Sequence, residues 1–371
     1  MNKWFLLTLL LNSIGLVPVA LAQGQENELQ PMAEVCEIAP AELRARYLVA
    51  KEQWPCQQGL PGDLAALPAV QETVPALVTL GVQLFHDPRL SSNGKVACSS
   101  CHQPQHQFND TVRISAGVEG REGRRTTPSL MNVDLWPVLF WDARENNLTA
   151  LAVQPLTNPV EMNSTPEHAA AAVANAREYA PLFENAFGDT EVSWERMAEA
   201  LAAFQRTLRS QDYDYEKFIQ AIEDKNFDEA GKHINDEQLL GLHLFRTRAR
   251  CVQCHHGPLL SDFKTHNMGL HYFGRKYEDL GVYAQSGNVE DVGHFRTSTL
   301  RHVSKTGLWM HNGLFFTMLG IVRMYGHGGP RPKPRADQVN NPLFPETSDE
   351  LIPFNLSYEE QQALVTFLNM L

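Results

Sequence analysis

The sequence is poor in positive charge and has only one long hydrophobic run. It contains 31 Lys and Arg against 43 Asp and Glu, which gives a formal net charge of −12. A surface of this sign repels phosphate backbones, so nucleic acid is excluded as a natural partner. Beyond the N-terminal run no segment is apolar enough to cross a bilayer, and we expect no membrane span in the mature chain.

The hydrophobic run at residues 4–21 is typical of an export signal. It follows Lys3, contains Pro18 and ends in Ala20-Leu21-Ala22, an A-x-A cleavage site. The unbroken apolar stretch is shorter than the roughly 20 residues that a membrane-spanning helix needs. We therefore expect residues 1–22 to be removed and the mature chain to work in a bacterial periplasm.

Cysteine is also scarce, with six in 371 residues. Four of them belong to two C-x-x-C-H motifs. The other two, Cys36 and Cys56, lie near the N-terminus of a chain that we expect in an oxidising compartment. That setting predicts a disulfide between them, with two free thiols as the alternative.

Each C-x-x-C-H motif follows a similar hydrophobic segment. Residues 80–85 read L-G-V-Q-L-F ahead of the motif at 98–102, and residues 240–245 read L-G-L-H-L-F ahead of the motif at 251–255. Leu and Phe at this spacing indicate a helix that faces a core, so the repeat predicts a duplicated module. We expect a mainly α-helical fold with two related domains.

C-x-x-C-H is the attachment sequence of c-type haem, in which two thiols bond the porphyrin and the adjacent histidine binds iron. The predicted attachment residues are Cys98, Cys101 and His102 for a first haem, and Cys251, Cys254 and His255 for a second. Zinc is the alternative, but the two cysteine pairs are about 150 residues apart and each has its own histidine. A thioredoxin-like motif would need a β-α-β context that the sequence lacks. We expect two covalent haems, one on each cytochrome-c-like domain.

The expected domain organisation follows from these motifs. It consists of the signal peptide at 1–22, an N-terminal extension at 23–70, a first cytochrome c domain at 71–230 and a second at 231–371. We place the joint near residue 230 because a polar segment that contains Gly231 leads into the second repeated helix.

Five further segments resemble the bacterial dihaem cytochrome c peroxidase and MauG family. They are residues 84–91 (L-F-H-D-P-R-L-S), 140–144 (F-W-D-A-R), 159–162 (P-V-E-M), 299–303 (T-L-R-H-V) and 310–313 (M-H-N-G). The segments occur in the family's order, and the likeness extends over most of the chain from about Leu80. The resemblance implies that the first haem meets hydrogen peroxide, that the second passes or stores electrons, and that a tryptophan lies between them.

The resemblance gives catalytic roles to two residues. Trp141 matches the bridging tryptophan, and Glu161 matches the acid–base carboxylate above the peroxide-binding iron. A desolvated carboxylate can take a proton from the near oxygen of peroxide and return it to the departing oxygen. Without the resemblance, Trp141 would be read as a core residue and Glu161 as a surface residue.

At the first haem the sequence departs from the family's pattern. Many family peroxidases have a histidine in the loop after the first motif that blocks the iron until reduction. Here Val118 lies near that position, and His106 is too close to the motif to match it. Leu151 stands where MauG-type sites have a glutamine, which predicts a drier pocket. We expect an open, five-coordinate first haem, which is the MauG-like condition.

The far ligand of the second haem separates the two branches of the family. The peroxidases use methionine, whereas MauG-like proteins use tyrosine, whose phenolate favours higher iron oxidation states. Counting fourteen residues beyond His311 in the M-H-N-G segment gives Tyr325. A shift of one residue would give Met324 instead, and His327 is a third candidate.

The resemblance also implies a calcium site between the haems. Thr126 takes the place of the family's asparagine, and Thr306 and Leu308 lie where two backbone carbonyls would bind the ion. Calcium prefers several hard oxygen ligands, and a hydroxyl is a weaker one than an amide oxygen. We expect calcium here with less support than for the haems.

These observations lead to three hypotheses of function. The leading one is a MauG-like enzyme that uses hydrogen peroxide and withdraws electrons from a periplasmic partner protein. A conventional peroxidase, which receives electrons from a small cytochrome or copper protein, is the alternative, and a pure electron carrier is the third. MauG-like proteins also use a surface tryptophan just before the second motif, but residues 247–250 read T-R-A-R. Trp136 and Trp309 could replace it, although both are expected in the core.

Overall fold

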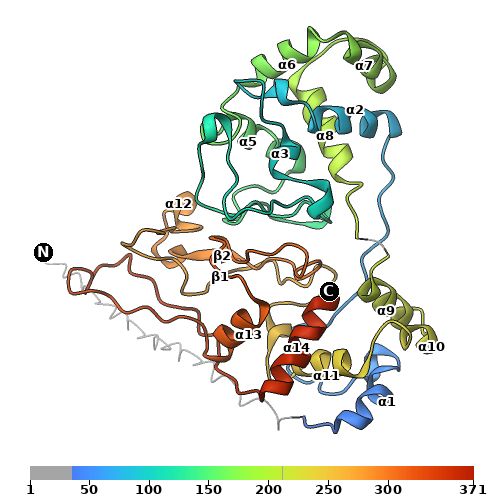
Figure 1. Ribbon diagram of the computed structural model, residues 1–371, viewed down its shortest axis with the longest axis vertical. Helices are drawn as coiled ribbons and strands as arrows, with labels where there is room; N and C mark the ends of the chain where they lie inside the picture. The colour runs from blue at the N-terminus through green and yellow to red at the C-terminus, as the bar shows by residue number, and fades with distance from the viewer. Residues whose placement is uncertain (1–35, 211) are drawn as a thin grey trace, which may run out of the picture. The chain divides into compact units, whose positions relative to one another are not determined.

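The computed structural model describes residues 36–210 and 212–371 (Figure 1). The predicted signal peptide at 1–22 and the first part of the extension lie outside these residues. Within them, none of the helices combines the length and the hydrophobicity that a membrane crossing requires.

The fold is mainly helical, as the sequence predicts. The α-helices in chain order are α1 (Leu43–Tyr47), α2 (Pro75–Phe85), α3 (Cys98–Cys101), α4 (Leu148–Leu151), α5 (Val153–Thr157), α6 (Pro166–Ala174), α7 (Ala180–Phe187), α8 (Trp194–Gln205), α9 (Asp214–Glu223), α10 (Phe227–Ala230), α11 (Asp236–Arg246), α12 (Tyr283–Ser286), α13 (Met318–Gly326) and α14 (Tyr358–Met370). Two short strands, β1 (Thr265–Asn267) and β2 (His294–Arg296), form an antiparallel ribbon in which Thr265 lies opposite Arg296.

Local sequence sets where the packing helices begin. Ser193 caps α8, because its hydroxyl accepts the N–H of Arg196. Ser357 and Glu360 form a capping box at α14: the Ser357 hydroxyl accepts the Glu360 N–H at 3.2 Å, and the Glu360 carboxylate accepts the Ser357 N–H at 2.8 Å. Both helices therefore start where they can bury an apolar face.

The buried apolar side chains form two cores. The N-terminal core extends from Leu80 to Leu208 and also takes in Leu259. The C-terminal core combines residues 43–64 with residues 215–371. The chain passes from one core to the other between Leu208 and Tyr215, earlier than the joint near 230 that the polar composition suggested. The reason is that α9 is polar on one face only and buries Phe218 and Ile222 in the C-terminal core.

The repeated L-G-x-x-L-F segments make the same kind of helix crossing in each core. In the N-terminal core α2 packs against α8, and in the C-terminal core α11 packs against α14 (Figure 1). The glycine of each segment is where the helices touch. A Cβ at Gly81 would lie 2.0 Å from the carbonyl oxygen of Ala200, and one at Gly241 would lie 2.1 Å from that of Ala363. The duplication therefore includes the partner helix and the contact between the two.

Replacing either crossing glycine by alanine is expected to destabilise the protein. Alanine normally favours an exposed helix, but here its methyl group would collide with a backbone and force the helices apart, at a cost of about 1–3 kcal/mol. Urea unfolding of Gly81→Ala and Gly241→Ala measures this. Gly123→Ala is the matched control, because the nearest atom to a Cβ there is 4.0 Å away. Unchanged unfolding midpoints for both crossing variants would contradict the packing argument.

From Leu43 to Leu64 the N-terminal extension packs against the C-terminal core, and only near its end does Leu67 contact the N-terminal core that follows it in the sequence. The Tyr47 hydroxyl is 3.0 Å from Nδ1 of His243 in α11. In the same helix Arg246 donates from Nε to the Asp63 carboxylate at 3.0 Å. The carbonyl of Asp63 accepts the Gly257 N–H at 2.8 Å, just after the second C-x-x-C-H motif. The extension thus holds both the helix and the loop that flank this motif.

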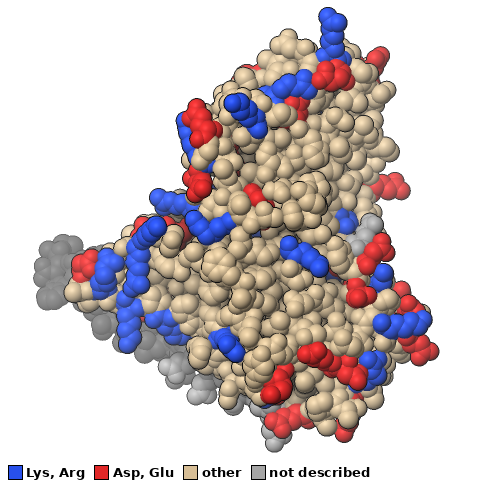
Figure 2. All heavy atoms as spheres, in the orientation of Figure 1, with Lys and Arg blue, Asp and Glu red and all other residues tan. Residues whose placement is uncertain are grey.

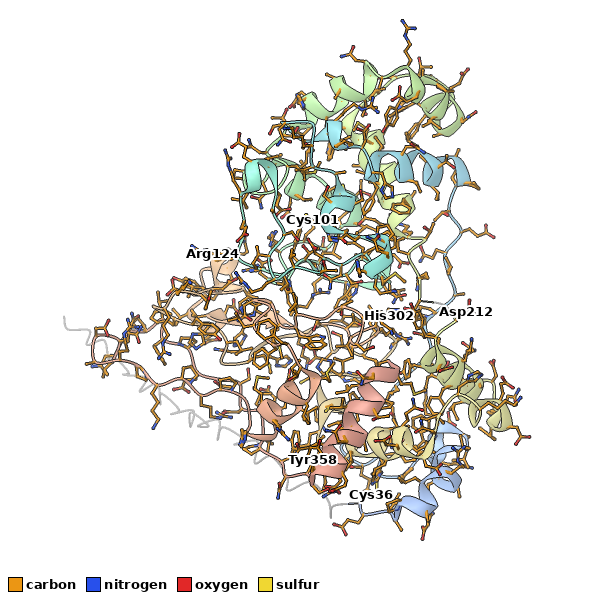
Figure 3. The ribbon with its side chains drawn as sticks, viewed as in Figure 1. Cys36, Cys101, Arg124, Asp212, His302 and Tyr358 are labelled. Atoms are coloured by element: carbon orange, nitrogen blue, oxygen red, sulfur yellow. A yellow bond between two sulfur atoms is a disulfide. The ribbon has the colours of Figure 1, made fainter. Side chains whose placement is uncertain are left out.

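A disulfide closes the extension. Cys36 and Cys56 are bonded, with their Cα atoms 6.0 Å apart. The carbonyl of Cys36 lies 3.1 Å from Nε2 of His243, so the bridge lies beside α11 (Figure 3).

Candidate functional site

Each C-x-x-C-H motif faces a cavity. The first cavity, of about 720 Å³, is lined by Cys98, Cys101 and His102 at α3, and Glu161 also lines it. The second, of about 240 Å³, is lined by Cys251, Cys254, His255 and, from α13, Tyr325. The structure therefore brings the predicted attachment residues together as two sets, one in each core.

The two motif histidines are held in the same way. Nδ1 of His102 is 3.0 Å from the carbonyl oxygen of Phe108, and Nδ1 of His255 is 2.9 Å from that of Leu260. A carbonyl only accepts, so each Nδ1 carries the proton and each Nε2 keeps a free lone pair. Burial lowers the pKa of both histidines and keeps the imidazoles neutral. A neutral imidazole oriented by such a bond is the form that binds a metal.

These cavities fit covalently attached haems. Burial raises the pKa of the Cys98 and Cys251 thiols to about 12, so both stay uncharged against apolar walls. When bound, haem would supply the chemistry of peroxide activation and electron storage, and the two cysteine pairs and two histidines would hold it. Another cluster of potential ligands, Cys254, Asp262 and His266, has its ligand atoms within 4.8 Å of one another. It shares Cys254 with the second motif, so we do not assign it to a separate metal.

Glu161 lies in the first cavity in a restrained position. Asn158 donates from Nδ2 to one of its carboxylate oxygens at 2.6 Å. Burial is the main influence on this carboxyl group and raises its pKa above the ordinary value. A carboxyl group of this kind, aimed into a cavity, is suited to taking up and returning a proton.

The loop that contains Val118 supports Glu161 from behind. The Val118 N–H donates to the Glu161 carbonyl at 2.8 Å, and its side chain is 1% exposed in the N-terminal core. Gly117 allows this approach, because a Cβ there would lie 2.2 Å from the carbonyl oxygen of Val160. Among the described residues that line the first cavity, His102 is the only histidine. Gly117 lines the first cavity, whereas Val118 does not.

Leu151 lines the first cavity beside Ala152. Gln154, one turn later, faces another group: its side-chain oxygen accepts from Nε of Arg144 at 2.7 Å. The nearest glutamine along the chain is therefore used to position an arginine, and the wall at Leu151 is apolar.

Trp141 lines both cavities, as do Trp136 and Arg296. Its indole N–H donates to the carbonyl of Thr126 at 2.9 Å, and its own carbonyl accepts the N–H of Arg296 at 2.9 Å. The next residue, Asp142, is buried between Arg125 and Arg144, each at 2.7 Å. Ion pairs and hydrogen bonds thus fix the tryptophan from several sides.

Arg125 extends this charged group across to the C-terminal core. It also contacts Asp279 at 2.7 Å, so one guanidinium joins a carboxylate from each core. Sequence reasoning did not find Arg125, Asp279 or Arg296. F-W-D-A-R named the aspartate and one arginine, but the other partners are remote in sequence and carry no motif.

Four residues of α13 line the second cavity: Met318, Ile321, Val322 and Tyr325. Met324 and His327, the alternatives that the sequence left open, are not among the described residues that line it. Met268 and Met310 line the cavity from other segments. The geometry of α13 therefore favours tyrosine over its neighbouring methionine as the side chain available to a second cofactor.

The predicted calcium donors are engaged with protein groups. The Thr126 hydroxyl donates to the carbonyl of Met310 at 3.1 Å, and the carbonyl of Thr306 accepts from Nδ2 of Asn109 at 3.2 Å. Leu308 lines the second cavity, and the oxygen expected to bind the ion there is its backbone carbonyl. Two of the three expected donors are thus already joined to protein groups, and we derive no step through calcium.

Removal of calcium is accordingly expected to have little effect. Dialysis against EGTA should leave the visible spectrum and the thermal unfolding midpoint unchanged, because protein hydrogen bonds already join the two cores here. A fall in the midpoint that added Ca²⁺ reverses would contradict this and restore the calcium site.

Comparisons with known proteins agree on one family. The model of the Di-haem cytochrome c peroxidase family matches residues 75–224. Cytochrome-c peroxidase IdrP1 of Pseudomonas sp. (strain SCT) is 31% identical over 324 residues, 79% of this chain and 80% of that protein. Methylamine utilization protein MauG of Methylorubrum extorquens is 31% identical over 307 residues, 82% of this chain and 80% of that protein.

Solved structures show a similar fold. The crystal structure of a MauG-like protein associated with microbial copper homeostasis has a TM-score of 0.70 and 25% identity, over 85% of this chain and 94% of that one. The diheme peroxidase BthA from Burkholderia thailandensis has a TM-score of 0.64 and 23% identity, over 82% and 89% of the two chains, and shows likeness of fold alone.

Proposed function

Since this chain belongs to the dihaem cytochrome c peroxidase and MauG family of peroxidase-type oxidoreductases, we propose that it is a MauG-like enzyme that uses hydrogen peroxide to oxidise a partner protein in the periplasm. Two c-type haems are the cofactors that the family implies. Cys98, Cys101 and His102 would hold the first, and Cys251, Cys254 and His255 the second.

The observation that carries the proposal is the place of Tyr325. It lines the cavity that contains the second motif, and its neighbour Met324 does not. A phenolate oxygen favours higher iron oxidation states, whereas methionine raises the reduction potential and suits electron transfer. Tyr325 therefore supports the branch in which the second haem stores an oxidising equivalent.

The first cavity supports the same branch. The side chain of Val118 lies in the core instead of the cavity, so the peroxide side of the first haem would be accessible in the oxidised protein. Glu161 takes the proton from the incoming peroxide and returns it to the leaving oxygen. Trp141, between the cavities, is placed for electrons to pass from one core to the other.

The conventional peroxidase stays as a second candidate because the comparisons favour neither branch. The peroxidase and the MauG protein named above are both 31% identical to this chain. In this alternative, hydrogen peroxide is reduced to water with electrons from a small cytochrome or copper protein.

Electrons from a partner protein would reach this chain by a different route from the exit tryptophan of MauG-like proteins. The stretch where MauG-like proteins have an exit tryptophan contains Arg248, which forms an ion pair with Glu360 of α14. Trp309 is only partly exposed, and its N–H is bound to the Val303 carbonyl at 2.7 Å. On the face shown in Figure 2 most of the surface is uncharged, and side chains of both signs lie mainly toward its edges, so its charge selects no single partner.

The test is to add stoichiometric hydrogen peroxide to the fully oxidised protein with no electron donor. A rapid, long-lived change in the spectra of both haems is expected. If no change occurs until one haem has been reduced, the first haem is blocked and the conventional cycle replaces the proposal.

A further inference from the structure

Arg296 is buried between the two cavities. It ends β2, and it lines the first and the second cavity alike. Its backbone N–H donates to the carbonyl of Trp141, so its place is tied to that of the bridging tryptophan. Only 8% of the residue is exposed.

The guanidinium has few partners for a buried charge. It stacks on the ring of Trp136 at 3.6 Å from the centroid, and Nη1 is 3.4 Å from the carbonyl oxygen of Val138. Nε has no hydrogen-bond partner, and within the described residues no carboxylate lies at ion-pair distance. Buried charges are normally paired, because an unpaired charge loses its hydration and gains nothing in return.

The other buried arginines show what is missing. Each forms an ion pair with a carboxylate: Arg209 with Asp134, Arg246 with Asp63 and Arg301 with Glu216. For Arg296, desolvation by burial lowers the pKa to about 9, and no carboxylate opposes that effect. Arg296 is therefore a buried cation for which the described residues supply no counter-anion.

The missing anion has a definite source if the cavities hold haem. Each haem has two propionate carboxylates, and a carboxylate is the group that the guanidinium fork binds best. We propose that Arg296 is a shared counter-ion for the propionates of both haems. The proposal rests on the chain carrying two haems, and it holds for either branch of the family.

A single cation beside both haems acts on both irons. Positive charge stabilises the reduced, less positive form of each haem, and it does so strongly where water is excluded. Neutralising Arg296 should therefore lower both midpoint potentials. Arg250 offers a matched control, because its Nε also lacks a partner but it lines the second cavity only.

The experiment is a potentiometric titration of purified dihaem protein carrying Arg296→Gln, Arg296→Lys or Arg250→Gln. Arg296→Gln is expected to lower both potentials, Arg296→Lys to lower them less, and Arg250→Gln to affect the second haem alone. A shift of only one haem, or of neither, in Arg296→Gln would overturn the proposal. A pyridine haemochrome assay tests the premise separately, because fewer than two haems per chain in the parent protein would remove the premise itself.

If the Arg296→Gln variant fails to acquire its haems, a second measurement tests the proposal on the parent protein. In the parent protein with ¹³C-labelled haem carboxylates, infrared spectra at neutral pH should show the labelled groups as ionised carboxylates, since a buried cation keeps them charged. A labelled band of protonated carboxylic acid from both haems would mean that no such counter-ion is present.

Discussion

Replacement of Glu161 by glutamine is expected to slow the reaction of the oxidised protein with hydrogen peroxide by about 100- to 10,000-fold, the usual contribution of a positioned acid–base group. Glutamine keeps the shape of the side chain and an oxygen for the amide of Asn158, which binds Glu161 at 2.6 Å. It cannot take the proton of peroxide. Stopped-flow absorbance of the first haem measures the rate.

Glu122→Gln is the control for this substitution. Glu122 lines the same cavity but is exposed, so its removal changes the charge near the site without touching the buried carboxyl group. Its rate should stay within a few-fold of the parent's. If Glu161→Gln reacts as fast as the parent protein, another group handles the proton and the assignment is wrong.

The pH dependence should carry the signature of the same group. Burial raises the pKa of Glu161, and the carboxyl group must be ionised to accept a proton. The rate is therefore full above this raised pKa and falls as the pH decreases through it, so the acid limb lies above the ordinary range for glutamate. Glu161→Gln should lose this limb. An unchanged acid limb in the variant would assign it to a different residue.

Replacement of Tyr325 is expected to change the spin state and the midpoint potential of the second haem. Tyr325→Phe removes the only side-chain oxygen that α13 offers to the second cavity, so a low-spin haem is expected to become high-spin. Tyr325→Met should raise the midpoint potential by on the order of 0.1 V or more, within the roughly 0.8 V that axial ligands span. Electron paramagnetic resonance and potentiometry measure the two effects.

Met324→Leu serves as the neighbouring control. Met324 does not line the second cavity, so its loss should leave the spectrum and the potential unchanged. The reverse pattern, with Tyr325→Phe silent and Met324→Leu altered, would place methionine on the iron and make the conventional peroxidase the better description.

The sequence predicted those parts of the site that depend on short stretches of chain. Cys98 to His102 form one local turn, and the count of fourteen residues from His311 that the resemblance supplied named Tyr325 as the candidate ligand, which stays a prediction. Arg296 could not be found in this way. The role proposed for Arg296 depends on β2, which bonds its backbone to that of Trp141, 155 residues earlier in the chain. It also depends on the absence of a carboxylate near the guanidinium among the residues that the structure describes.

Two expectations depend on contacts that the sequence does not reveal. Residues 210–235 are polar enough to be taken for a linker, yet Phe218 and Ile222 give α9 a buried stripe that joins the second core. The resemblance matched Thr306 to a calcium donor, and the structure adds that Asn109 donates a hydrogen bond to its carbonyl. In both cases the contact comes from a distant segment.

The packing of the extension has a consequence for how the protein is assembled. Tyr47 and its partner His243 are 196 residues apart in the chain. If the chain is exported as proposed, the extension emerges before α11 and has to wait for its partner. Contacts of such long sequence separation are slow to form. The hydrogen bond from Gly257 to Asp63, just after the second C-x-x-C-H motif, is expected to form with them, which would leave this motif accessible for haem attachment until the extension has packed.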